Sequence, residues 1–283
     1  MLGATVIDSD LVSRKIADDR LGLFQSDHDY DMISNANAEA GLHKLEEDTV
    51  AKAKASGDAD AEEHFYYSMY EPSHPAVVRE YLDSGILVEL LKKKKVKMLE
   101  PPSQWDFLSD PCYAYVLVSA CAMSLGCTLP SDDLILLKKV YTEGGLMPGA
   151  LKQMHKALYG PDGYNNGVAY DFKSKDLLET ASSARDESIS CSRGFIPLNV
   201  IGPGGFFNTG MGNSTTSPII KELRAQYAMP DACGGCGITA EKSAEPLMRC
   251  AKCAHRMYCG KVCQKKHWKI HKKVCDPAIK LMD

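Results

Sequence analysis

The sequence predicts a mainly α-helical protein with a small cysteine-rich unit near its C-terminal end. Residues 1–160 contain successive segments of strong helix formers and no segment with the period of two that a strand requires. Of the 11 cysteines, 7 fall between Cys233 and Cys275. The charge divides at the same place, because residues 231–283 carry a formal charge of +6 and residues 1–230 one of −10. A chain of 283 residues is long enough for two such units.

Glycine, serine and proline mark the ends of the predicted helices in the first 160 residues. Ser56-Gly57 ends the first helix, the Glu71-Pro72 step ends the second, and Ser84-Gly85 ends the third. The predicted helices span Ala36–Ala55, Ala61–Tyr70, Ser73–Leu82, Ile86–Met98, Cys112–Leu125, Asp132–Tyr141 and Gly149–Leu158.

A helix, a glycine corner and a second apolar helix occur twice, around Gly85 and around Gly145. This arrangement resembles the helix pairs of armadillo and HEAT repeats. The two glycines lie 60 positions apart, whereas those repeats have a period of about 40–47 residues, so a regular solenoid would need an insertion. The alternative is an irregular helical bundle with glycine at helix ends. We expect an irregular helical domain over residues 1–158, with armadillo- or HEAT-like helix pairs.

The stretch from Pro111 to Ser131 contains no charged residue and is about as long as a membrane-spanning helix. Prolines bound it and several polar residues interrupt it, so we expect a buried core helix and no membrane partner. The first residues lack the basic and apolar regions of a secretory signal. These features predict an intracellular protein of the nucleus or the cytoplasm, in which clustered cysteines are metal ligands more often than disulfides.

Composition divides the remaining chain into four segments. Residues 159–216 are rich in Gly, Ser, Asn and Pro, which predicts a loop or linker region. The glycine-rich run 205–212 lacks the Lys followed by Ser/Thr that ends a phosphate-binding loop. A connecting helix is predicted over residues 217–230, with Pro218 in its first turn. The cysteine-rich unit follows at 231–276, and residues 277–283 form a tail.

The cysteine-rich unit has the ligand spacing of two zinc sites. Pairs of cysteines two residues apart allow a tight turn to direct both sulfur atoms toward one ion. The eight candidate ligands are Cys233, Cys236, Cys250, Cys253, Cys259, Cys263, His271 and Cys275. Because eight ligands fill two tetrahedral sites, we expect two structural Zn²⁺ ions and no open catalytic position. His267 is an alternative to His271, since both continue a row at four-residue spacing from Cys263.

The segment 258–275 resembles the C-terminal half of a MYND-type zinc finger. It contains the Tyr-Cys step at Cys259, the Cys-Gln step at Cys263, Trp268, and the His-x3-Cys element that ends at Cys275. The resemblance covers residues 233–275 only. It implies a cross-brace in which one zinc is held by Cys233, Cys236, Cys259 and Cys263, and the other by Cys250, Cys253, His271 and Cys275. It also favours His271 over His267 as the ligand.

The resemblance implies a peptide-binding role for Gln264 and Trp268, because MYND fingers that bind proline-containing peptides use these motif positions. The two residues lie one turn apart and about 100° from the ligand row, which predicts a solvent-facing pair. The alternative is that Trp268 packs in the finger's small core. Lysines at four-residue spacing suggest nucleic acid instead: Lys261, Lys265, Lys269 and Lys273. Seven thiolates and two Zn²⁺ reduce the unit's charge to about +3, which favours a protein partner.

A second basic run, Lys92–Lys97, resembles a monopartite nuclear import signal. The alternative is a structural role, because cations near the C-terminal end of a helix interact favourably with its dipole.

These observations predict a zinc-binding protein-interaction module that docks proline-containing peptides, and we expect its process to be transcriptional or chromatin regulation. Two alternatives remain open. The first is a diverged relative of the SET/MYND methyltransferases, although the sequence has no Asn-His-x-Cys segment of the SET type. The second is a nucleic-acid-binding finger. No catalytic residues are predicted, and Cys112, Cys121, Cys127 and Cys191 are expected to be buried thiols.

Overall fold

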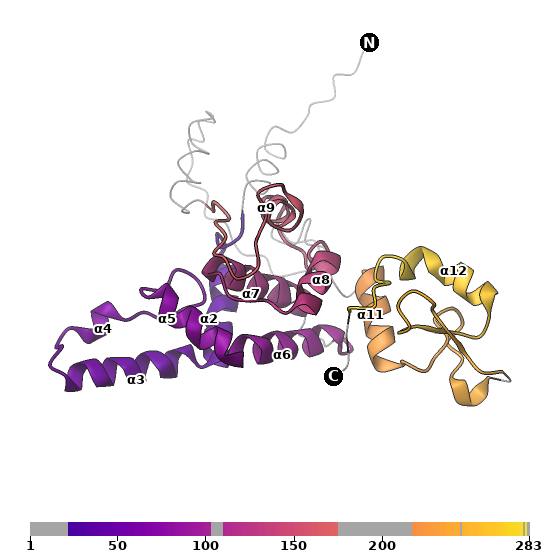
Figure 1. Ribbon diagram of the computed structural model, residues 1–283, viewed down its shortest axis with the longest axis horizontal. Coiled ribbons are helices and arrows are strands. Elements are labelled where there is room, and N and C mark those ends of the chain that lie inside the picture. The colour runs from indigo at the N-terminus through magenta and orange to yellow at the C-terminus, as the bar shows by residue number, and fades with distance from the viewer. Residues whose placement is uncertain (1–21, 103–109, 175–216, 244, 280, 282–283) are drawn as a thin grey trace, which may run out of the picture.

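The computed structural model describes residues 22–102, 110–174, 217–243, 245–279 and 281. These residues form an elongated arrangement of helices with a small finger at one end (Figure 1). The elements are α2 (Asp27–Ala40), α3 (Leu42–Ala55), α4 (Ala61–His64), α5 (Pro75–Tyr81), a π-helical turn (Leu82–Ile86), α6 (Leu87–Leu99), α7 (Pro111–Leu125), α8 (Ser131–Val140), α9 (Pro148–Tyr159), α11 (Pro218–Ala228), a 3-10 turn (Ala240–Lys242), β1 (Met248–Arg249), β2 (Met257–Tyr258) and α12 (Lys261–His271). The mainly helical fold class is therefore confirmed.

The helix α7 forms the centre of the helical part because it is apolar on all sides. Every residue from Pro111 to Met123 is buried, and α2, α5, α6 and α8 all contact this helix. Its first turn is capped by Asp110, whose carboxylate accepts hydrogen bonds from the backbone N–H groups of Cys112 and Tyr113. The predicted core helix is confirmed. Among the described residues, no helix combines the length and the apolar character needed to cross a membrane.

The single helix predicted over Ala36–Ala55 is wrong, because two helices occupy this stretch. Gly41 lies between α2 and α3 in the left-handed region, with φ of 74°, and so ends the first helix. The hydroxyl of Tyr81 donates a hydrogen bond to the carbonyl of Ala40 at 2.9 Å. This contact from α5 occupies one of the carbonyls that the break leaves free.

The helix predicted over Ala61–Tyr70 ends at His64 in the structure. Side chains of other helices bind the backbone of the residues that follow. Glu46 accepts the N–H of Tyr67 at 2.6 Å, and the buried Asn37 accepts the N–H of Met69 at 2.9 Å. Tyr67 and Met69 bury their side chains in the core, so tertiary contacts override the local helix propensity.

The two glycine corners of the sequence both lie in the left-handed region, with φ of 115° at Gly85 and 76° at Gly145. They separate α5 from α6, through the π-helical turn, and α8 from α9. The armadillo- or HEAT-like interpretation of these helix pairs stays a prediction, as do the proposed domain boundaries. The predicted loop region lies outside the described residues from position 175 onward.

The lysine run Lys92–Lys97 lies on α6, and two of its lysines form ion pairs with carboxylates of other helices. Lys94 Nζ lies 2.7 Å from a carboxylate oxygen of Glu39. Lys95 is buried, and its Nζ lies 3.9 Å from Asp133 Oδ1 on α8. A structural role within the helical part thus accounts for these two lysines.

The helix α11 connects the helical part to the finger. Its first turn is capped by the hydroxyl of Ser217, and the side chains of Ile220 and Leu223 are fully buried in the main core. Arg224 Nε donates a hydrogen bond to the carbonyl of Met98 on α6 at 2.9 Å. The helix also contacts α12 of the finger, so it packs on both parts.

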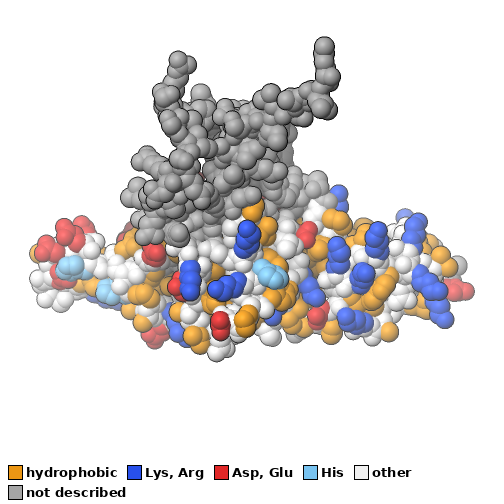
Figure 2. Space-filling view, turned by 90° about the horizontal axis from the view of Figure 1, so that it is seen from above, with side chains coloured by type: hydrophobic (Ala, Val, Ile, Leu, Met, Phe, Trp, Pro, Cys, Tyr) orange, Lys and Arg blue, Asp and Glu red, His pale blue; other side chains and the backbone are white. Residues whose placement is uncertain are grey.

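The opposed charges of the two parts lie at opposite ends of the molecule. Figure 2 shows acidic side chains gathered at the end formed by α3 and α4, and Lys and Arg side chains over the end formed by the finger. The finger carries six exposed lysines on α12 and directly after it: Lys261, Lys265, Lys266, Lys269, Lys272 and Lys273. None of them forms an ion pair with another residue in the described part of the chain.

The C-terminal end of α7 provides a test of the fold. Gly126 has φ of 75°, and an added Cβ would lie 2.5 Å from the backbone nitrogen of Ala169. Gly57 also has positive φ, but an added Cβ would meet nothing within 4 Å. We expect Gly57→Ala to lower the free energy of unfolding by about 1 kcal/mol from backbone strain, and Gly126→Ala by about 1–3 kcal/mol more from the clash. Urea unfolding followed by circular dichroism measures both, and equal midpoints would contradict the packing of Ala169.

Candidate metal centre

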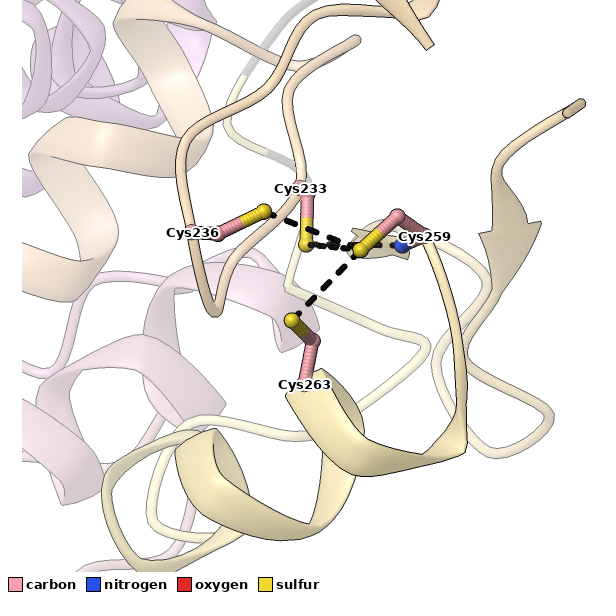
Figure 3. Close-up of side chains that lie close together, drawn as sticks. All are labelled: Cys233, Cys236, Cys259 and Cys263. Atoms are coloured by element: carbon pink, nitrogen blue, oxygen red, sulfur yellow. Dashed lines mark hydrogen bonds between the residues drawn. The ribbon is translucent and has the colours of Figure 1, made fainter. Parts of the chain in front are cut away.

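Four thiols from three places in the finger form the first cluster. Cys233 and Cys236 lie on a tight turn before the hairpin, Cys259 follows β2, and Cys263 lies in the first turn of α12 (Figure 3). Cys259 Sγ lies 3.7 Å from the Sγ of Cys233, 3.6 Å from that of Cys236 and 3.5 Å from that of Cys263. The four sulfur atoms therefore surround one common point.

Three thiols and one imidazole form the second cluster. Cys250 and Cys253 flank the turn after β1, His271 is the last residue of α12, and Cys275 follows that helix. The Sγ atoms of Cys250 and Cys275 are 3.8 Å apart, and Cys253 Sγ lies 3.5 Å from His271 Nε2. All four residues are buried.

Both clusters have the dimensions of a tetrahedral zinc site. With Zn–S bonds of about 2.3 Å and Zn–N bonds of about 2.0–2.1 Å, a tetrahedron has S–S edges of about 3.8 Å and S–N edges of about 3.6 Å. The distances of 3.5–3.8 Å match these edges. They are too long for disulfide bonds of about 2.05 Å, and the seven cysteines are free. The clusters alternate along the chain and thus fit a two-zinc cross-brace.

Two glycines allow the first turn to approach its neighbours closely. A Cβ on Gly234 would lie 2.6 Å from Arg256 Nε and 2.8 Å from His267 Nδ1. A Cβ on Gly235 would lie 2.6 Å from the Cβ of Cys263. The sequence Cys-Gly-Gly-Cys therefore supplies two ligands of the first metal site. The two glycines between them are small enough for the turn to pack against Arg256, His267 and Cys263.

Backbone groups of the clusters stabilise thiolates. Burial alone raises the pKa of the Cys233 thiol. Hydrogen bonds from backbone N–H groups outweigh the effect of burial and lower this pKa to about 6; the donors are Cys259, Cys236 and Gly235. Burial likewise opposes ionisation of Cys250, and the N–H groups of Cys253 and Lys252 lower its pKa to about 6. Each cluster thus contains a thiol whose pKa lies below its ordinary value, which favours the thiolate form that binds zinc.

The structure places His271, and not His267, in the second cluster. The hydroxyl of Tyr258 lies 3.1 Å from His267 Nδ1, and His267 Nε2 lies 3.1 Å from Glu222 Oε2. Because other groups occupy both of its ring nitrogens, His267 is a neighbour of the metal site and not a ligand.

A buried carboxylate from outside the finger lies beside the second cluster. Glu222 of α11 is 4% exposed, and its Oε1 lies 3.3 Å from His271 Nδ1. Burial alone raises the pKa of Glu222, but hydrogen bonds from His267 and His271 and the charge of Arg256 outweigh it and lower the pKa to about 2. The sequence does not mark Glu222 as a functional residue, because a glutamate in an amphipathic helix is typical of a solvent-facing position.

The geometry defines residues 232–275 as a small cross-brace finger with two structural zinc sites. The family model of the MYND finger matches the same residues, 232–275. This segment is therefore a MYND finger, as the sequence resemblance implies, and MYND fingers are zinc-binding modules of protein interaction and not catalytic centres. No curated protein and no solved structure matches the chain.

The described cysteines outside the finger belong to the helical part. Cys112, Cys121 and Cys127 are buried there, and burial raises the pKa of all three thiols, so that they stay protonated. Cys191 lies outside the described residues.

Removal of zinc tests the structural role of the metals. A finger of about 45 residues cannot bury enough apolar surface to be stable alone, and a structural zinc contributes about 10–16 kcal/mol of apparent binding free energy. We expect a chelator to collapse the dispersed NMR amide signals of residues 233–275, while those of α7 persist. A zinc-saturated chelator is the control. A finger that loses its zinc but keeps dispersed signals would contradict this role.

The close approach of Gly235 to Cys263 gives a site-specific test. Gly235→Ala should displace Cys263 and weaken the first zinc site by about 5–150-fold, the equivalent of the roughly 1–3 kcal/mol typical of overpacking. Gly260→Ala is the matched control, because an added Cβ there meets nothing within 4 Å. Competition with a chromophoric chelator measures both affinities. Equal affinities for the two variants would show that the turn accommodates the added methyl group.

Proposed function

We propose that the finger docks proline-containing peptides of partner proteins through Gln264 and Trp268 of α12. The observation that carries this proposal is the exposure of an indole on a metal-anchored helix. Trp268 is 40% exposed although it is a large apolar residue, whereas His271 on the ligand side of the same helix is fully buried. Gln264 lies one turn before Trp268 and is half-buried. A flat apolar surface beside a side-chain amide is suited to a pyrrolidine ring and its neighbouring carbonyl.

The platform is rigid because α12 contributes ligands to both metal sites. Cys263 in its first turn belongs to the first cluster, and His271 at its end belongs to the second. A peptide that approaches Trp268 therefore meets a helix that is held at both ends. A proline-rich peptide has also lost part of its conformational freedom before binding. Preorganisation of both partners reduces the entropy cost of association.

The charge around Trp268 supports peptides with acidic flanks. Lys265 and Lys269, three residues before and one residue after Trp268, are both exposed. Complementary charge increases association rates and selects between similar sequences. We propose a partner peptide in which prolines contact the indole and acidic residues lie beside these lysines, with transcriptional or chromatin regulation as the process.

Two further functions have separate tests. A nucleic-acid-binding finger would use the exposed lysines of α12 and would lose affinity steeply as salt increases. A diverged relative of the SET/MYND methyltransferases would bind a methyl donor, which calorimetry can measure directly.

The peptide site is tested by Trp268→Ala in the full chain. We expect this variant to bind a fluorescent proline-rich peptide with acidic flanks at least tenfold more weakly in anisotropy titrations. The reason is that truncation of an aromatic anchor residue removes about 2 kcal/mol or more of binding free energy. Both variant and wild type should retain two zinc ions. Val262→Ala is the matched control, since Val262 is 81% exposed on the same helix.

Two results would contradict parts of this proposal. One is equal affinity of wild type and Trp268→Ala for the peptide. The other is equal affinity of the wild type for peptides with acidic and with basic flanks at low salt, which would remove the role of Lys265 and Lys269.

A further inference from the structure

We infer that Glu222 of α11 is a positioning residue for the second zinc site, and that this site's structural unit begins at α11 and not at residue 232. Glu222 lies 49 positions before His271 and outside the segment that matches the MYND family model. Its carboxylate is among the most buried charged groups of the described residues. A carboxylate is retained in such a place when other groups pair with it.

Three basic side chains of the finger converge on this carboxylate. Oε1 lies 3.3 Å from His271 Nδ1 and 3.3 Å from Arg256 Nε. Oε2 lies 3.1 Å from His267 Nε2. Within α11, Gln226 Nε2 donates a further hydrogen bond to Oε1 at 2.8 Å. Both oxygen atoms thus have partners, and all three basic partners come from the finger.

The contact with His271 determines which ring nitrogen faces the metal site. A carboxylate only accepts hydrogen bonds, so Nδ1 of His271 carries the proton and donates it to Glu222. Nε2 is then the unprotonated nitrogen, and it is the atom that lies 3.5 Å from Cys253 Sγ in the second cluster. A carboxylate behind a zinc-ligating imidazole fixes its tautomer and ring orientation and increases its basicity.

The position of Glu222 is set by the helical part of the molecule. Ile220 and Leu223, on either side of it in the sequence, are fully buried in the main core. Arg224, two residues further, donates its hydrogen bond to the carbonyl of Met98 on α6. The second zinc site is therefore connected through α11 to α6. In the described part of the chain, no buried carboxylate forms a hydrogen bond with a ligand of the first site, which consists of Cys233, Cys236, Cys259 and Cys263.

The test uses the full chain with cadmium in place of zinc. Cadmium NMR gives separate signals for the first site, with four sulfur ligands, and the second site, with three sulfur ligands and one nitrogen. Glu222→Gln keeps the shape of the side chain and removes its charge, and Glu222→Ala removes the acceptor as well. Ile219→Val is the control, because it loosens the packing of α11 without altering the carboxylate. Chelator competition, followed on each signal, gives the affinity of each site. Nitrogen NMR of His271 reports its tautomer.

We expect Glu222→Ala to weaken the second site by about 10–100-fold and the first site by less than about twofold. Glu222→Gln should cause a smaller loss at the second site, because the amide oxygen still accepts from Nδ1. Ile219→Val should lower thermal stability by the small amount typical of this substitution and leave the ratio of the two affinities unchanged.

Two outcomes would overturn the inference. If Glu222→Ala and Glu222→Gln weaken both sites equally, Glu222 contributes only general stability to the finger. If neither variant changes the affinity of the second site or the His271 nitrogen shifts, the carboxylate does not position the ligand.

Discussion

The tetrahedral coordination of two metal ions is the constraint on which the finger depends. Its two clusters take ligands alternately along the chain, and each cluster joins α12 to a part of the finger that precedes this helix. The regular structure of the finger is slight, since each strand of its hairpin has only 2 residues. So small a unit cannot be stabilised by apolar burial. The metal sites therefore supply the stability that a larger domain obtains from its core.

The same constraint explains how a small finger can present a defined surface. Because α12 carries a ligand for each site, its orientation is determined at both ends, and the side chains on its outer face are presented by a rigid element. Glu222 of α11 contacts the ligand His271, and Arg224 of α11 donates a hydrogen bond to the carbonyl of Met98 on α6, so α12 is connected through α11 to α6. The acidic helical part and the basic finger are thus connected by one helix that packs on both, and the surface charge remains separated along the molecule (Figure 2).

Local signals predicted most of the helices and all eight metal ligands. The helices from α6 to α9 and α11 begin and end within two residues of their predicted bounds, because prolines, serines and glycines act on the backbone near them. The errors at Gly41 and after His64 have different causes. The helix predicted from Ala36 begins at Asp27 and is divided at Gly41, where a left-handed glycine is a local signal that the prediction did not use. After His64, the distant side chains of Glu46 and Asn37 bind the backbone, and no local pattern reports such contacts.

The chemistry of the finger can be predicted from the sequence, since zinc requires thiolate and imidazole ligands at short spacings and these are visible along the chain. The spacing of the ligands left His267 and His271 as alternatives, because both lie on the same face of α12, and the resemblance to MYND fingers favoured His271. Their surroundings in the folded chain distinguish them: Tyr258 and Glu222 occupy the nitrogens of His267, whereas His271 contacts Glu222 through Nδ1 and directs Nε2 toward Cys253. The sequence does not show this difference because a buried carboxylate acts on its neighbours in space, and the fold brings Glu222 to residues far along the chain.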